Sequence, residues 1–195
     1  MPGRGLIQGK HMVALQFLLC RFGLPLVLAP VLALLLSGAA AAQVARFVGD
    51  YAGSAEVEIW DGSTARRDMS VSITETRDGF NVKWSSTTYR GDKGKEKAYS
   101  VNFVPTDRDS VFAAAMARDV FGHEKPLDPM KGEPYVWARI KGDTLSVYSL
   151  FVADDGSFEL QQFDRTLVPE GLRLDFSSIT EGGPRRGVTT VLVRR

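Results

Sequence analysis

Side chains that commonly perform catalysis are scarce in this sequence. Its 195 residues include one cysteine, Cys20, and two histidines, His11 and His123. His123 has the chemistry of a general base or of the histidine in a Ser-His pair. However, no Gly-x-Ser-x-Gly elbow accompanies it, and its glycine, charged and proline neighbours are typical of an exposed loop. We therefore expect a solvated histidine and identify no catalytic residue.

Two arginines set among aromatic residues indicate a different chemistry, the binding of an anion. A guanidinium inside a barrel must be paired or hydrated. An Arg and a Tyr hydroxyl that face a cavity can hold the carboxylate or phosphate head of an otherwise apolar ligand. The alternative is that each Arg lies near a rim and reaches solvent or a carboxylate. The predicted ligand-binding residues are Tyr135, Trp137, Arg139, Tyr148, Phe163 and Arg165.

Short segments in which polar and apolar residues alternate must position these side chains. From Phe47 onward such segments keep meeting turn residues, for example "MSVSITET" before "RDG" and "YVWARI" before "KGD". Turn signals about every 8 to 12 residues predict an all-β sandwich or barrel. Connections this short make neighbouring strands antiparallel, and a meander most simply closes into an up-and-down barrel. We predict one up-and-down barrel domain over residues 43–195, with roughly eight to ten strands and at most one short helix.

One part of the domain interrupts this pattern. The alanines of "DSVFAAAMARDVFG" favour a helix, but Arg118 falls on the helical face of the apolar residues, so a short helix and an irregular strand both stay open. A proline-rich connection follows over residues 122–134, and its prolines fix an extended path and remove hydrogen-bond donors. This connection is either an Ω-like structural loop or a lid over the barrel mouth.

Two-residue turns predict the strand register in the second half of the chain. The proposed turns are Gly142-Asp143, Asp155-Gly156 and Glu170-Gly171, and the resulting pairs include Trp137 with Tyr148, Tyr148 with Phe163, and Arg165 with Phe176. One face of this four-strand unit then carries large apolar groups on every strand, whereas the other turns polar from Gln162 to Asp175. We predict that the first face is the interior, with an aromatic row of Trp137, Tyr148 and Phe163.

The first 42 residues have the composition of a secretory signal peptide. Their only charged residues, Arg4, Lys10 and Arg21, precede the apolar run "FGLPLVLAPVLALLLS" and the small residues "GAAAA". We expect cleavage after Ala42 and export to the periplasm or the medium. The alternative is a retained transmembrane anchor, because the stretch is close to the roughly 20 residues that span a bilayer. Its two prolines and its short apolar core argue against that alternative.

The composition of residues 43–195 excludes several functions. Removal of the first 42 residues takes three of the 24 basic residues and none of the 23 acidic ones, so the net charge becomes 21 − 23 = −2. With no cysteine and one histidine, this domain lacks the usual ligands of a zinc site and cannot form a disulfide. Without a basic block it has no electrostatic footprint for nucleic acid. We predict no metal, no cofactor, no nucleic-acid partner and no transmembrane span after cleavage, and leave a protein partner open.

Three short motifs bear on the class of barrel. Gly49-Asp50-Tyr51 lies near the start of the domain, Thr106-Asp107 lies in the middle, and Arg194 lies at the end of the last segment. The first is similar to the Gly-x-Trp of lipocalins with Tyr in place of Trp, and Arg194 could serve as the arginine that packs over that aromatic. Thr106-Asp107 resembles the family's Thr-Asp motif, but it comes early and lacks the aromatic that follows. The chain thus resembles the lipocalin and fatty-acid-binding type of barrel, and also small exported bacterial proteins of unknown function. The lipocalin-like resemblance implies ligand binding without catalysis.

Two functions of different classes follow. The first is a non-catalytic exported barrel that binds a small amphipathic or anionic lipid-like molecule, with Arg139 or Arg165 on its anionic head. The alternative is an envelope structural or interaction protein whose barrel is filled by its own side chains and has no ligand. An enzyme such as a carboxylate-based hydrolase ranks last, although 23 acidic residues leave pairs of carboxylates available.

Overall fold

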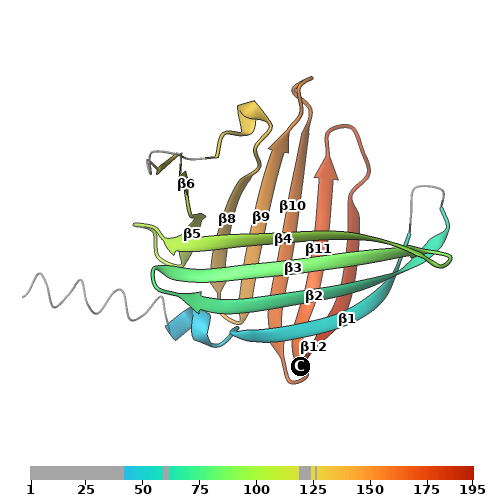
Figure 1. Cartoon of the computed structure of the whole chain (residues 1–195), viewed down its shortest axis with the longest axis horizontal. Helices are drawn as coiled ribbons and strands as arrows, with labels where there is room; N and C mark the ends of the chain where they lie inside the picture. The colour runs from blue at the N-terminus through green and yellow to red at the C-terminus, as the bar shows by residue number, and fades with distance from the viewer. Residues whose placement is uncertain (1–41, 59–61, 119–123, 126) are drawn as a thin grey trace, which may run out of the picture.

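Alternating segments of the chain form ten antiparallel strands that close into a barrel (Figure 1). The structure is a computed structural model that describes residues 42–58, 62–118, 124–125 and 127–195. The barrel strands are β1 (Gly49–Glu58), β2 (Thr64–Thr76), β3 (Gly79–Arg90), β4 (Lys93–Pro105), β5 (Val111–Ala114), β8 (Tyr135–Lys141), β9 (Thr144–Val152), β10 (Phe158–Val168), β11 (Gly171–Thr180) and β12 (Arg186–Arg194). A separate pair, β6 (Ala117–Arg118) and β7 (Glu124–Lys125), and a 3-10 turn, η1 (Pro129–Lys131), lie in the β5–β8 connection. The predicted all-β barrel, its strand number and its antiparallel order are confirmed.

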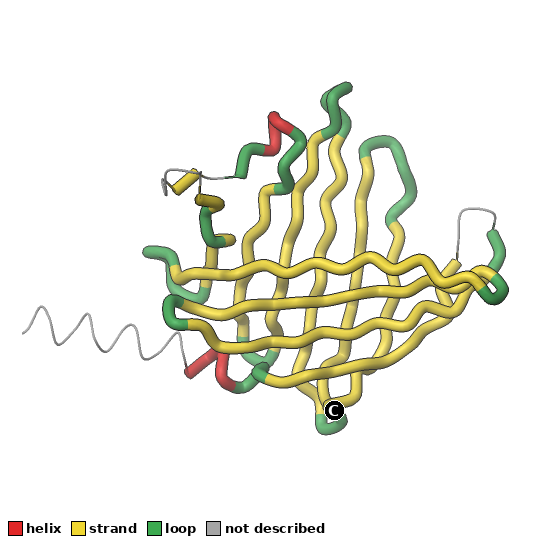
Figure 2. The backbone as a smooth tube through the Cα atoms, in the orientation of Figure 1, coloured by secondary structure: helices red, strands yellow, loops and turns green. Residues whose placement is uncertain are grey.

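The barrel is a meander built from two facing layers. Each strand pairs with the next along the chain except at the β5–β8 step, and β12 returns to pair with β1. Figure 1 shows β1–β4 crossing in front of β8–β12 at a steep angle. The tube in Figure 2 shows the long hairpins of β1–β4 running across the strands behind them. The interior therefore lies between these two layers.

The alanine-rich segment forms a strand and not a helix. Phe112 of β5 is buried, and it pairs with Pro105 of β4 and with Ala138 of β8. Burying a phenylalanine contributes about 1.5–3 kcal/mol, more than the helix propensity of a few alanines. The irregular strand is thus the alternative that the chain adopts. His123 lies outside the described residues.

The segment before β1 closes one end of the barrel. Residues 42–45 form a helical turn, and Val44 and Phe47 are buried in the core. Behind them Phe80 stacks on Phe103 at 5.1 Å between ring centroids and meets Phe112 edge-on at 5.0 Å. Such aromatic pairs add about 0.5–1.5 kcal/mol each beyond the area that they bury. This packed end is the floor of the barrel interior.

The register of β8 and β9 is as predicted, but that of β9 and β10 is not. Trp137 pairs with Tyr148, as a Gly142-Asp143 turn requires. Phe163 pairs with Val147, whereas the prediction paired it with Tyr148. The cause is the turn between β9 and β10, which spans residues 153–157 instead of only Asp155-Gly156. It is closed by two backbone hydrogen bonds, from the Ala153 amide to the Ser157 carbonyl and from the Gly156 amide to the Ala153 carbonyl.

This one-residue difference reverses the faces of β8 and β9, because side chains alternate along a strand. The inward-facing residues of the two strands are Val136, Ala138, Ile140, Leu145 and Val147, all of them buried. The predicted interior face of these strands is therefore wrong, and Tyr135, Trp137, Arg139 and Tyr148 lie on the outer surface.

The faces of β10 and β11 are as predicted although their register differs. Val168 pairs with Gly171, so the turn is Pro169-Glu170 and not Glu170-Gly171. Arg165 consequently pairs with Leu174 rather than Phe176. A shift of two residues leaves every side chain on its original face, and both Phe163 and Arg165 face the interior.

Candidate functional site

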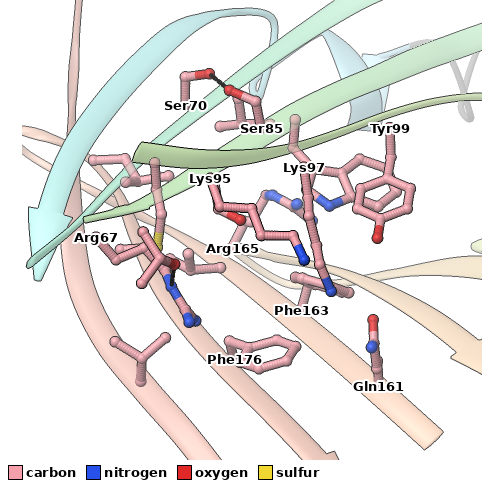
Figure 3. Close-up of a pocket in the computed structure, with 18 residues that line it drawn as sticks. Arg67, Ser70, Ser85, Lys95, Lys97, Tyr99, Gln161, Phe163, Arg165 and Phe176 are labelled. Atoms are coloured by element: carbon pink, nitrogen blue, oxygen red, sulfur yellow. Dashed lines mark hydrogen bonds between the residues drawn. The ribbon is translucent and has the colours of Figure 1, made fainter. Parts of the chain in front are cut away.

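Above the closed end the barrel contains a cavity of about 200 Å³ (Figure 3). Its walls come from β2, β3 and β4 in one layer and from β10, β11 and β12 in the other. The cavity continues into a wider mouth of about 1110 Å³, with which it shares Lys95, Lys97 and Phe176 as lining residues. The barrel is therefore packed at one end and hollow at the other.

Arg165 of β10 lines this cavity as a buried guanidinium that makes no ion pair within the described residues. It is only 1% exposed, and its Nε and Nη1 atoms have no hydrogen-bond partner in the described part of the chain. Burial lowers the pKa of Arg165 to about 10, which the charge of Asp164 partly opposes, so the guanidinium is still charged at neutral pH. Leaving two nitrogens of a buried cation without hydrogen-bond partners destabilises the fold. An anion in the cavity would offset that cost.

Aromatic rings surround this guanidinium. Its central carbon lies 5.7 Å from the ring centroid of Trp84 and 5.5 Å from that of Phe163. Trp84 stacks on Tyr99 at 5.3 Å across the β3–β4 pair, and Phe163 lies 4.8 Å from Phe176 across the β10–β11 pair. The cation–π contacts partly stabilise the buried charge, and the rings offer apolar contact to a bound molecule.

The mouth is strongly cationic. Among the described residues, eight cations and two carboxylates line the cavity and the mouth together. The cations are Arg67, Arg90, Lys93, Lys95, Lys97, Arg165, Arg185 and Arg186, and the carboxylates are Glu58 and Glu159. Since residues 43–195 carry a net charge of 21 − 23 = −2, this excess is local. Such a lining raises the local concentration of anions.

Two of the polar side chains on this wall are engaged by neighbours. Glu159 accepts hydrogen bonds from Gln161 Nε2 and Ser178 Oγ, both at 2.8 Å. Arg67 donates from Nε to Thr88 Oγ1 at 2.8 Å, and burial lowers the pKa of its guanidinium. Both hydrogen bonds to Glu159 reach its Oε1 atom, and within the described residues no ion pair joins this carboxylate to a cation.

Only two of the six predicted ligand-binding residues line this cavity, Phe163 and Arg165. The other four form or flank an aromatic row on the outside of the barrel. There Trp137 stacks on Tyr148 at 4.9 Å, and Tyr135 lies 5.7 Å from Trp137. Arg139 is exposed on the same face, opposite Ser146. The predicted cross-strand aromatic contact between Trp137 and Tyr148 exists, but it lies outside the cavity.

The cavity is also lined by residues that were not among the six predicted: Trp84, Tyr99 and the cations of β2 and β4. A signal for them was present in the Gly91-Asp92 turn, which pairs Arg90 with Lys93 and thereby places Trp84 opposite Tyr99. The same register reasoning, extended to the first half of the chain, would have found this aromatic pair.

Arg194 packs over Tyr51 at the closed end, a contact that the sequence leads us to expect for this pair. Its guanidinium carbon lies 5.7 Å from the ring centroid, and its Nη2 atom donates to the Val48 carbonyl at 2.7 Å. Thr106 of the middle motif stabilises a turn, since its Oγ1 donates to the Val111 carbonyl at 2.8 Å.

Comparison with protein-family models, with curated proteins and with solved structures yields no match for this chain. No helix within the described ranges is long and apolar enough to cross a membrane. The same ranges contain no group of three or more His, Cys, Asp or Glu side chains that could hold a metal ion. Fold and cavity together define a closed ten-stranded antiparallel β-barrel with an interior, cation-lined pocket.

Proposed function

We propose that this protein is a non-catalytic, exported barrel that binds a small amphipathic molecule with an anionic head. Arg165 receives the head, and the rings of Trp84, Phe163 and Phe176 contact the apolar body. We further propose that the barrel is of the lipocalin-like type and works in the periplasm or the medium.

One observation carries this proposal: a fully buried guanidinium with two nitrogens unpartnered in the described chain, at the bottom of a cavity. Buried charges in proteins are normally paired because desolvation costs several kcal/mol per ion. If Arg165 served only to fill the barrel, an apolar residue of similar volume at this position would give a more stable fold. A carboxylate, phosphate or sulfate supplies two oxygens that match the donor geometry of a guanidinium.

The size of the cavity limits the part of the ligand that it encloses. Its volume of about 200 Å³ is below the roughly 300–1,000 Å³ of pockets that hold drug-sized ligands. The inner cavity therefore suits the head and a short or cyclic apolar part, and any longer chain would extend into the mouth. This refines the sequence-based expectation of a lipid-like ligand.

Native mass spectrometry tests the proposal. The protein is purified from a host that exports it, and its native mass is compared with its mass after denaturation. We expect a mass excess that is lost on denaturation, that is absent from the Arg165→Met variant, and that persists in Arg139→Met. Arg139 is the matched control because it is an arginine on the outer face of the same barrel.

The proposal would be overturned if the native mass equals the mass of the denatured chain, and still does so after incubation with an envelope lipid extract. That result would support the second candidate, an envelope structural or interaction protein without a ligand. A mass excess that persists in Arg165→Met would show that the protein binds a ligand without the help of Arg165.

A further inference from the structure

The β3–β4 hairpin places two lysines on the wall of the cavity in a regular ladder. Tyr99, Lys97 and Lys95 are alternate residues of β4 and face the interior, opposite Trp84, Ser86 and Thr88 of β3. Arg67 of β2 also pairs with Thr88 and lines the same space. Figure 3 shows Lys95 and Lys97 extending from β4 into the cavity, on the side that faces Phe163 and Phe176.

These cations have few partners of their own. Neither Lys95 nor Lys97 makes an ion pair or a side-chain hydrogen bond within the described ranges of the chain. Glu159, the carboxylate on the opposite wall, is occupied by Gln161 and Ser178. Lys95, Lys97 and Arg67 thus face one space without an ion pair, within the described residues, to the carboxylates Glu58 and Glu159 that also line the mouth. The mutual repulsion of the three cations opposes this arrangement.

Lys97 and Lys95 lie between Arg165 and the mouth, at distances that the strand geometry gives. Trp84 contacts the Arg165 guanidinium, so the Trp84–Tyr99 pair marks the level of the deep charge. Lys97 is two residues further along β4 toward the mouth and Lys95 four, which corresponds to about 7 Å and about 13 Å of strand rise. The interval between the two charge levels is lined by aromatic rings.

We propose that Lys95, Lys97 and Arg67 form a second anion subsite, and that the natural ligand is an elongated dianion with an aromatic or other apolar body. This inference rests on the proposed function, because it assigns the first anionic group to Arg165. One end of the ligand pairs with Arg165, its body lies along the rings of Trp84, Phe163 and Phe176, and its other end pairs with the mouth cations. A ligand with a single head would leave the mouth cations to water.

Two matched probes test this subsite: a naphthalene monocarboxylate and the naphthalene dicarboxylate whose two groups stand at opposite ends of the rings. Both are titrated calorimetrically into the full-length mature protein. We expect the dicarboxylate to bind about tenfold more tightly or better, because the second carboxylate gains a charge-assisted hydrogen bond.

Variants assign the gain to the subsite. Lys97→Gln should lower the affinity for the dicarboxylate to that for the monocarboxylate and leave the monocarboxylate unchanged. Lys83→Gln is the matched control, since Lys83 is exposed on β3 and does not line the cavity. Arg165→Met should weaken both probes.

The outcomes separate the two proposals. Equal affinities of the two probes for the wild-type protein would overturn the second subsite and leave Arg165 as a single anion site. An advantage of the dicarboxylate that survives in Lys97→Gln, and in Lys95→Gln and Arg67→Gln, would also overturn it. Failure of both probes to bind would contradict the proposed function itself, and with it the subsite.

Discussion

Arg194, near the end of the last strand, lies over the ring of Tyr51 in the first, with 5.7 Å between the guanidinium carbon and the ring centroid. The two residues are also a register pair of β1 and β12, the strands that close the barrel. The Tyr51 hydroxyl donates to the Phe47 carbonyl at 3.0 Å, so the same ring holds the segment that plugs the barrel end. Burial raises the pKa of Tyr51, an effect that the Arg194 charge opposes. The contact between Arg194 and Tyr51 thus links the β1–β12 pairing that closes the barrel to the segment that covers its packed end.

Replacing Arg194 with Ala should lower the free energy of unfolding by about 1–2 kcal/mol, because it removes a cation–π contact and a charged hydrogen bond. Urea denaturation followed by circular dichroism measures this change. Arg195→Ala is the control, since Arg195 uses its backbone amide, and not its side chain, to bind the Asp50 carbonyl. If both variants lose the same stability, the side chain of Arg194 does not fasten the closure.

Truncating Phe47, whose ring is buried at the closed end of the barrel, should lower the free energy of unfolding by more than Arg194→Ala does. Phe47→Ala deletes a ring with no exposed surface, and such truncations typically destabilise by about 3–5 kcal/mol. Phe158→Ala removes the same atoms from a strand end where the ring is 40% exposed, and it should cost well under half as much. Equal midpoints of urea unfolding for the two variants would show that the segment before β1 is not part of the folded domain.

The fold was predictable from the sequence because turns and alternation recur in every segment. The apolar pattern defined the strands and the absence of crossover helices made them a meander, and both predictions are confirmed. The two faces of β8 were harder to separate, because Val136 and Ile140 on one face and Tyr135 and Trp137 on the other are all apolar or aromatic. The prediction of which face of β8 points inward therefore depended on the register set by the turn between β9 and β10.

At that turn the predicted register of β9 and β10 is wrong. Asp155-Gly156 is a typical two-residue hairpin turn, but here Asp155 accepts hydrogen bonds from the backbone amide and the hydroxyl of Ser157. This capping extends the turn to residues 153–157 and changes the register by one residue. The predicted inward orientation of Arg165 and Phe163 is confirmed, because the register of β10 and β11 differs from the prediction by an even number of residues.

The two tryptophans in cross-strand stacks should differ in their effect on binding. Trp84→Ala removes the ring that contacts Arg165 and should weaken the naphthalene monocarboxylate by about tenfold, since aromatic contacts of this kind contribute about 1 kcal/mol or more. Trp137→Ala removes an equal ring from the outer face and should leave the affinity unchanged. Calorimetric titration compares the two, and weakening by Trp137→Ala alone would move the binding site to the outer surface.

Arg165 should stabilise the complex and destabilise the empty protein. Arg165→Met replaces a buried cation by an apolar side chain of similar length, and we expect the free energy of unfolding to rise by about 1–3 kcal/mol in the absence of ligand. The folded-state pKa of about 10 lies well below the ordinary value of an arginine, so above about pH 10 the unfolded chain binds more protons than the folded one. The cost of the charge is therefore complete below about pH 10, and the gain in Arg165→Met should not vary with pH near neutrality.

Thermal unfolding without ligand measures this gain, with Arg139→Met as the exposed control. A loss of stability in Arg165→Met would mean that the guanidinium is already satisfied in the folded protein. In that case the side chain acts as core packing, and the second candidate function becomes the better one.

The pH dependence of binding follows from the same group. Arg165 in the empty protein has a pKa of about 10, and a bound anion raises it because the opposite charge favours the protonated form. Affinity for the naphthalene monocarboxylate should therefore be constant from about pH 6, where a carboxylate with a pKa near 4 is fully ionised, to about pH 9. Above about pH 10 it should fall as one proton is lost from the free protein. Repeating the titration with Lys97→Gln separates the mouth cations from this effect. A decline that begins near neutral pH in both proteins would show that a group other than Arg165 receives the head.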